Sequence, residues 1–252
     1  MTSVSLIGLN TLPTITSGTD LVAEILDAAD REAVAFQDGD ILVVAQKIVS
    51  KAEGRLLPLS ALAPSADAAR LAEVTQKDAR LVEAILSESV GTLRTRPGLM
   101  VVEHRLGHIM ANAGIDRSNI GGDADMILLL PEDPDASAAA LREGIAAATG
   151  SEIGVIVSDS FGRPWRMGTT GVAIGVAGPA MLLDRRGEAD RDGRRLEVTE
   201  VAFADSVAAA GVLVMGEGAE GRPAVVVRGL DWTPTHQGAR DGLRPAGQDL
   251  FR

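Results

Sequence analysis

The residues of this chain best suited to chemistry lie in three acid-bearing segments. Asp159 and Ser160 follow the apolar run Gly154–Val157. Asp116 comes after a glycine turn, and Glu217 lies in a stretch rich in glycine. Hard cations such as Mg²⁺ and Mn²⁺ bind carboxylate and hydroxyl oxygens together with waters and phosphate oxygens. The three segments therefore predict a divalent cation beside a phosphorylated substrate.

Each segment also has a simpler structural interpretation. Asp159 would accept backbone hydrogen bonds in a turn, and Asp116 would cap a helical turn. Gly216 would end the Ala-rich helix before it. Helix termination does not explain Gly218 and Gly221, which would let backbone N–H groups converge on an anion. The residues alone leave both interpretations open.

Basic and amide side chains near these segments are candidates for binding anions. Lys51 is predicted to follow a strand and to contact a phosphate, although a solvated lysine would fit the same pattern. Asn119 lies three residues after Asp116 and would hydrogen-bond a ligand through its amide. Arg163 and Arg166 would clamp a carboxylate or phosphate, or would pair with neighbouring acids.

Composition narrows the classes of protein to consider. The formal charge of −11 and the six aromatic residues (two Trp, four Phe) argue against nucleic acid as a partner. The absence of cysteine excludes disulfides and thiolate metal sites. No apolar run approaches the roughly 20 residues of a membrane span, and no signal peptide is evident. We therefore expect a cytoplasmic protein without membrane contact. The phosphate-binding Gly-x-x-x-x-Gly-Lys-Ser/Thr motif is also missing.

Apolar periodicity predicts a mixed α+β fold, with mixed sheets and flanking helices. The expected strands are Val4–Leu9, Ile41–Ala45, Leu99–Val102, Met126–Leu130, Gly154–Val157 and Ala224–Val227. The expected helices are Leu21–Ala29, Ala66–Val74, Asp78–Leu86, Ser137–Ala148 and Val198–Met215. Residues 131–135 are predicted to form a turn that feeds the start of a helix. We expect one main domain over residues 1–231, and a C-terminal tail over residues 232–252 that is poorly ordered.

The ordered set of motifs resembles the coenzyme F420:L-glutamate ligase (F420-0:γ-glutamyl ligase) family. The resemblance runs from about Leu9 to Trp232, and no single motif in it is diagnostic. The matching segments are Gly39–Val44, Val49–Arg55, Asn112–Asp116, Ser158–Arg163, Gly171–Gly175, Met215–Gly218 and Pro223–Leu230.

The resemblance implies a GTP-dependent ligase that adds L-glutamate to a deazaflavin coenzyme precursor, F420-0, in coenzyme F420 biosynthesis. It implies catalytic roles for Asp116, Asp159 and Glu217. One divalent cation (Mg²⁺ or Mn²⁺) would bind Asp116 and Asp159, and a second would bind Ser160 and Glu217; K⁺ is a further candidate. It also implies two intertwined subdomains and a homodimer.

The residues that the resemblance assigns to the nucleotide come from several segments. They are Asn10, Thr11, Leu12, Pro13, Gln46, Lys47, Lys51, Asn119, Met215, Gly216, Glu217, Gly218, Ala219, Glu220, Gly221 and Arg222. Arg163 and Arg166 would contact the substrate. The family often has threonine in place of Ser160 and smaller hydroxyl residues in place of Gln46 and Lys47.

Two other functions would also use the acidic residues Asp116, Asp159 and Glu217. A metal-dependent phosphohydrolase would release phosphate without joining glutamate, and a nucleotide- or deazaflavin-binding protein would turn over neither. Some bacterial ligases carry a C-terminal flavin-binding, nitroreductase-like domain. This chain stops at Arg252 without one, so we expect any reductase step to belong to another protein.

Overall fold

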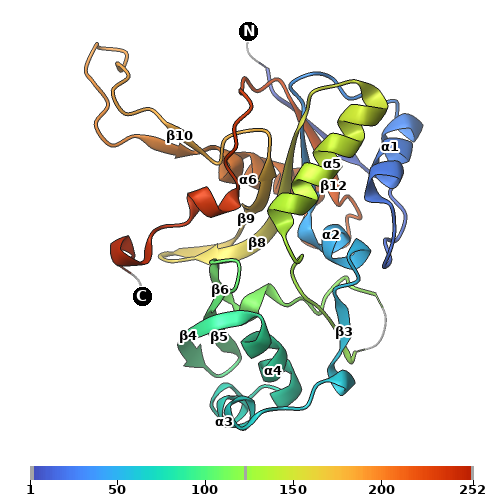
Figure 1. Cartoon of the computed structure of the whole chain (residues 1–252), viewed down its shortest axis with the longest axis vertical. Coiled ribbons are helices and arrows are strands. Elements are labelled where there is room, and N and C mark those ends of the chain that lie inside the picture. Colours follow the sequence, from blue (N-terminus) through green and yellow to red (C-terminus); the bar gives the residue numbers. More distant parts are fainter. Residues whose placement is uncertain (1–2, 122–123, 251–252) are drawn as a thin grey trace.

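A five-stranded sheet forms the centre of the computed structural model, which describes residues 3–121 and 124–250 (Figure 1). In spatial order its strands are β1 (Ser5–Leu9), β12 (Ala224–Arg228), β2 (Ile41–Ala45), β8 (Gly154–Arg163) and β9 (Arg166–Ala177). β2 and β8 run parallel, whereas the other neighbouring strands are antiparallel. The mixed α+β prediction is confirmed.

Both faces of this sheet are buried, each against its own core. Leu42 and Val44 of β2 enter the core beneath α1 (Leu21–Arg31) and α5 (Pro134–Thr149). The alternate residues Ile41 and Val43 enter the core beneath α6, which spans Phe203–Met215. This alternation follows from the pleat of a strand, and a strand buried on both faces has a continuous apolar sequence.

The α5 helix starts where the sequence predicts a turn leading into a helix. The Asp133 carboxylate accepts a hydrogen bond from the Ala136 N–H at 3.1 Å, and Pro134 occupies the first turn. An aspartate cap followed by proline is favoured at a helix start, because proline lacks the N–H that would otherwise be unpaired there.

A smaller lobe, which we define as residues 56–129, is inserted between β2 and β8 and has its own apolar core (Figure 1). β3 pairs with β7, and β4, β5 and β6 form a three-stranded sheet against α3 and α4. Their bounds are β3 (Leu56–Pro58), α3 (Ala66–Thr75), α4 (Ala79–Ser87), β4 (Ser89–Arg96), β5 (Leu99–His104), β6 (Ile109–Ala111) and β7 (Met126–Leu128).

The predicted helix over Val198–Met215 is wrong in its first turn and a half. Glu200–Ala202 form strand β11, which pairs with β10 (Leu182–Asp184) at the base of the arm that projects at the upper left of Figure 1. Val198, the first residue of the predicted helix, is 84% exposed. Pairing with β10 provides backbone hydrogen bonds that the apolar spacing of the sequence does not reveal.

The C-terminal segment returns to the sheet. The Trp232 indole donates to the Gly39 carbonyl at 2.8 Å, and the Thr235 N–H donates to the Gly178 carbonyl at 2.7 Å. Two short 3₁₀ turns follow, at Ala239–Gly242 and Ala246–Gln248. The outermost residues of the predicted domain and tail (1–2 and 251–252) lie outside the described residues, and the boundary at residue 231 stays a prediction. In the described ranges, no helix is long and apolar enough to cross a membrane.

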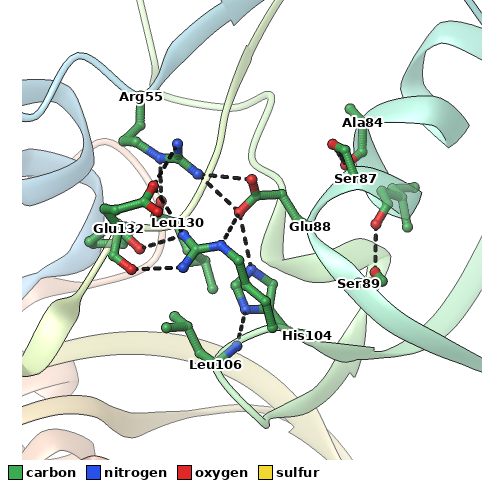
Figure 2. Close-up of polar contacts among 12 residues, drawn as sticks. Arg55, Ala84, Ser87, Glu88, Ser89, His104, Leu106, Leu130 and Glu132 are labelled. Atoms are coloured by element: carbon green, nitrogen blue, oxygen red, sulfur yellow. Dashed lines mark hydrogen bonds and ion pairs between the residues drawn. The ribbon is translucent and has the colours of Figure 1, made fainter.

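A buried carboxylate at the junction of the two lobes binds two arginines (Figure 2). Arg55 reaches both oxygens of Glu88 at 2.9 Å, and Arg105 reaches one of them at 3.1 Å. Both arginines also pair with Glu132, which precedes α5 in the sheet lobe. His104 completes the group, with its Nε2 3.4 Å from Glu88. Because Arg55 and Glu132 flank the small lobe in the chain, these pairs join the two lobes.

Burial alone would raise the pKa of Glu88, but its partners outweigh that effect. The hydrogen bond from His104 and the charges of Arg55 and Arg105 lower this pKa to about 2. The Nδ1 of His104 accepts the Leu106 N–H at 3.0 Å, so the ring proton sits on Nε2, facing Glu88. Glu88 is therefore ionised throughout the neutral range, with its charge fully matched.

Candidate functional site

A cavity of about 540 Å³ opens where α2 (Gln46–Ala52), β8 and the loop after α6 meet. Most of the residues predicted to bind nucleotide or metal line it. They are Leu12, Pro13, Gln46, Lys47, Lys51, Asn119, Asp159, Ser160, Met215, Gly216, Glu217, Gly218, Ala219, Gly221 and Arg222. The fold thus brings together segments that are far apart in the sequence.

Asp159 lies within β8 rather than at its end, which corrects the predicted strand Gly154–Val157. The strand continues to Arg163 because it pairs with β9, and the register of that pairing shifts between Val157 and Ser158. Bulges of this kind are common beside active sites, where they redirect a side chain. Asp159 is the second residue after the shift, on the β8 segment that lines the cavity.

Asp116 is positioned by a tight turn and by backbone pairing. Asn112, Ala113 and Gly114 all have positive φ, an arrangement that is costly for the two non-glycine residues. Asp116 then exchanges two backbone hydrogen bonds of 2.9 Å with Leu128. The predicted glycine turn before Asp116 is therefore present, and it brings the small lobe to the edge of the cavity.

Two side chains of α2 hold the Asp116 carboxylate. The Gln46 amide donates to it at 2.6 Å, and the Lys47 ammonium lies 3.3 Å away. Burial raises the pKa of Asp116, while Lys47 and Gln46 oppose that rise. Sequence reasoning missed α2, which is short and begins directly after β2 without a side-chain cap.

The Asp159 carboxylate has no ion pair of its own among the described residues, and the charge of Lys47 only partly offsets the effects that raise its pKa. Burial and the neighbouring charge of Asp116 raise the pKa of Asp159 to about 7, and Glu217 adds to the rise. Its side chain accepts a hydrogen bond of 2.8 Å from the N–H of Ser160. Asp116, Asp159 and Glu217 therefore interact electrostatically with one another, and a cation between them would relieve the repulsion.

Ser160 and Glu217 form a second pair of oxygen ligands, since the Ser160 hydroxyl donates to Glu217 at 2.8 Å. Glu217 reaches this position because Gly216, with φ of 73°, ends α6 and turns the chain. Within residues 3–121 and 124–250, no three His, Asp or Glu side chains are close enough to cage a metal ion. The candidate ligands instead form two pairs, Asp116 with Asp159 and Ser160 with Glu217. Two protein ligands for each ion suit Mg²⁺, which usually keeps waters and substrate phosphates as its other ligands.

Lys51 and Asn119 link the remaining walls of the cavity. The Lys51 ammonium donates to the Asn119 carbonyl at 3.0 Å, and the Asn119 amide donates to the Gly218 carbonyl at 2.9 Å. Lys51 was predicted to follow a strand; it lies in the last turn of α2, which begins directly after β2. Burial and the nearby Lys47 lower the pKa of Lys51. The lysines therefore lie close together and would be stabilised by an anion.

Two buried polar atoms of the cavity wall have no hydrogen-bond partner among the described residues. They are the Ser158 hydroxyl and the Nε of Arg222. Leaving such groups unpaired costs about 1–3 kcal/mol each, so they are usually explained by a missing ligand or water. Sequence reasoning missed Ser158, although its position beside Asp159 is the signal that could have found it.

Some predicted site residues lie elsewhere. The backbone N–H groups of Asn10 and Thr11 donate to the Glu32 carboxylate at 2.6 and 2.8 Å, and neither residue lines the cavity. Glu220 folds back onto the Gly218 N–H at 2.8 Å. Arg163 and Arg166 are exposed at the β8–β9 turn, where Arg163 donates weakly to the Gly168 carbonyl at 3.4 Å.

Comparison with known proteins gives consistent matches. The family model for F420-0:Gamma-glutamyl ligase matches residues 10–229. The Coenzyme F420:L-glutamate ligase of Methanothermobacter thermautotrophicus is 46% identical over 251 residues, which cover 99% of each chain. The protein of the same name from Natronomonas pharaonis is 48% identical over 248 residues, covering 96% of this chain and 92% of the relative.

Proposed function

Because the chain belongs to the F420-0:gamma-glutamyl ligase family, we propose that it joins L-glutamate to a deazaflavin coenzyme precursor in coenzyme F420 biosynthesis. In the proposed reaction GTP is the phosphoryl donor. Two divalent cations, Mg²⁺ or Mn²⁺, assist, with K⁺ as a further candidate. The observation that carries the proposal is the gathering of Asp159, Ser160 and Glu217 on one cavity with Lys47 and Lys51. Asp116 does not line the cavity, but it is held against its wall by Gln46 and Lys47.

Amide formation from a free carboxylate needs a better leaving group than oxide. Phosphoryl transfer from GTP to the precursor carboxylate would give an acyl phosphate and GDP. The uncharged amine of glutamate would then attack the acyl carbon, and phosphate would leave as the amide bond forms. The amine gives up its proton in this step. Phosphoryl transfer depends mainly on positioning and on stabilisation of charge, which a rigid, charged cavity supplies.

The oxygen ligands fit two cations. Asp116 and Asp159 are the pair that repel each other in the absence of a cation, and Ser160 and Glu217 are the second pair. A bound divalent ion would neutralise phosphate charge and orient the phosphate oxygens. The protein's part is to hold the two oxygen pairs on β8 and on the loops that begin at Asn112 and Gly216.

The nucleotide would lie along the wall formed by α2 and the loop 216–221. Lys47 and Lys51 stand on successive turns of α2 and provide positive charge on one side of the cavity. Arg222, whose Nε is unpaired among the described residues, provides positive charge near the end of that loop. Gly216, Gly218 and Gly221 leave room for a ligand to approach the backbone. This arrangement supports nucleotide binding without a P-loop.

The proposal is tested by mass spectrometry of the precursor after incubation with the protein, L-glutamate and Mg²⁺ or Mn²⁺. Parallel reactions contain GTP, ATP or no nucleotide. We expect a glutamate-extended product only with metal and GTP, together with an equal amount of GDP. Nucleotide hydrolysis without extension would indicate a phosphohydrolase and would overturn the ligase assignment for this precursor. Tight binding without either product would indicate a binding protein.

A further inference from the structure

A second cavity, of about 370 Å³, lies between the two lobes and the C-terminal segment. Its walls come from the β5–β6 turn, the start of α5, β9 and the 3₁₀ turn at Ala239–Gly242. No residue that lines it also lines the first cavity. The proposed roles of the first cavity therefore leave this one unexplained.

Two of its polar side chains, Arg240 and His108, are uncommitted. In the described part of the chain, the Arg240 guanidinium makes neither a hydrogen bond nor an ion pair. The His108 imidazole also lacks a hydrogen bond there, although only 6% of the residue is exposed. Burial, with the nearby His104 and Arg240, lowers the pKa of His108 to about 4, so the ring is neutral at pH 7. A neutral imidazole still donates one N–H.

The other charged groups of this cavity are already in use. Arg105 is bound to Glu88 and Glu132. Asp133 caps α5, and Asp135 accepts the N–H groups of Val176 and Ala239 at 2.8 and 2.9 Å. The groups left to recognise a ligand are thus one cation and one neutral N–H donor, which together match a carboxylate.

The second cavity lies close to the proposed reaction site. The Phe161 ring packs edge-on against His108, with 6.1 Å between ring centroids. Phe161 is two residues from Asp159 on β8, so both side chains point to the same face, about 6.5 Å apart along the strand. The ring contact therefore places His108 one side chain away from the segment of β8 that carries Asp159, although Phe161 lines neither cavity.

We propose that Arg240 and His108 bind a free carboxylate of one of the two substrates to be joined, L-glutamate or the coenzyme precursor. The inference rests on the proposed ligase function and specifies where an acidic substrate is held. Arg240 pairs with the carboxylate from the solvent-exposed side, and the buried His108 N–H fixes its position. Charge pairing from one side and a directional donor from the other would select an acid over its amide.

The test compares Arg240→Gln with the matched control Arg244→Gln, an exposed arginine in the same segment that lines neither cavity. KM values are measured separately for L-glutamate, the precursor and GTP. We expect Arg240→Gln to raise KM for one carboxylate substrate about tenfold or more, with KM for GTP unchanged. Arg244→Gln should match the wild type. The substrate whose KM rises is the one bound there.

A second measurement does not depend on turnover. The chain has three histidines, so the His108 Cε1–H signal is assigned by its loss in His108→Gln. L-Glutamate or the precursor should shift this signal in the wild type and in Arg244→Gln, but far less in Arg240→Gln. Unchanged KM values together with an unmoved signal would overturn the inference. A wild type that makes no extended product would instead refute the proposed function, and the signal would still report whether a carboxylate binds.

Discussion

Two carboxylates of this protein, the buried Glu88 and the half-buried Asp159, differ in how their partners offset the loss of water. Glu88 is surrounded by Arg55, Arg105 and His104, and its pKa falls to about 2. Asp159 is half-buried, and desolvation together with the like charge of Asp116 raises its pKa to about 7. Both groups bear the cost of leaving water. The partners of Glu88 outweigh that cost, whereas the Ser160 N–H and the charge of Lys47 offset only part of it for Asp159.

The contrast separates a structural site from a functional one. A fully matched carboxylate fixes the junction between the lobes and has no remaining capacity for a ligand. A poorly matched carboxylate destabilises the empty protein and gains from any cation that arrives, which is how binding sites are commonly built. The same comparison distinguishes Arg105, which is fully paired, from Arg240, which has no ion pair among the described residues.

The largest effect is expected from removing the unmatched charge. Asp159→Asn should lower the rate of glutamate addition by about 10²–10³-fold, as loss of one well-placed electrostatic group typically does. Its stability without metal at pH 8 should rise. A raised folded pKa means that stability falls as pH increases from the unfolded value toward 7, and asparagine removes that loss.

The check combines steady-state kinetics with urea unfolding, and Asp27→Asn on the exposed side of α1 is the control. A variant that keeps wild-type turnover would show that Asp159 is not a metal ligand. A variant that loses stability at pH 8 would show that the charge is matched after all.

Removing the matched charge should instead cost stability. Glu88→Gln leaves two arginines facing a neutral amide, and breaking such a buried pair costs about 3 kcal/mol in the free energy of unfolding. The folded pKa of Glu88 is depressed, so its contribution is complete above about pH 4.5 and is lost as pH falls toward 2. The variant should lack this acid-dependent loss. Urea unfolding from pH 3 to 7 measures the loss of stability and its dependence on pH, with Glu73→Gln at an exposed position as the control. Equal stabilities of the variant and the wild type at pH 7 would contradict the structural role of Glu88.

His108 should produce a slightly smaller acid sensitivity in a higher pH range. Its folded pKa of about 4 lies below the ordinary value of 6.5, so the folded state binds fewer protons than the unfolded chain. Stability should be complete above pH 6.5 and fall by about 2–3 kcal/mol toward pH 4. His108→Gln should flatten this part of the profile, whereas His236→Gln at an exposed position should not. A profile that His108→Gln leaves unchanged would mean that the ring is protonated in the folded protein.

The smallest effect is expected at Lys51. Replacing it with alanine should weaken GTP binding about tenfold, since one charge-assisted contact to a phosphate is lost. Lys77→Ala, in the small lobe outside the cavity, is the control. Isothermal titration calorimetry with a non-hydrolysable GTP analogue measures the difference. Equal affinities would remove Lys51 from the nucleotide site while leaving the metal assignment intact.

Most of the elements that bury apolar side chains were predictable from the sequence, whereas those defined by pairing were not. β2 has the predicted bounds Ile41–Ala45 because its apolar run is buried on both faces. β9 was missed because small and hydroxyl residues interrupt its pattern. Its glycines have a packing role: a side chain at Gly171 would approach the Ala208 carbonyl at 2.6 Å, and one at Gly175 would clash with Pro134.

The candidate site shows the same division. Asp116, Asp159, Ser160 and Glu217 were identifiable because acids and hydroxyls beside apolar runs and glycines are conspicuous in a sequence. Their mutual arrangement depends on long-range pairing, such as that between Asp116 and Leu128, which no local pattern encodes. His108 showed no metal-ligand spacing, and its significance comes from burial and from contact with Phe161.

The position of β12 in the sheet has a consequence for synthesis of the chain. β12, the last of the five strands in the chain, lies between β1 and β2, the first two. During synthesis β1 must therefore wait until β12 has been made before its ladder can form, and Glu217 joins Ser160 at about the same stage. Long-range strand insertion of this kind slows folding and exposes edges to aggregation. Nascent chains should thus remain without a complete central sheet until β12 has emerged from the ribosome, and chaperone dependence should be greatest before that point.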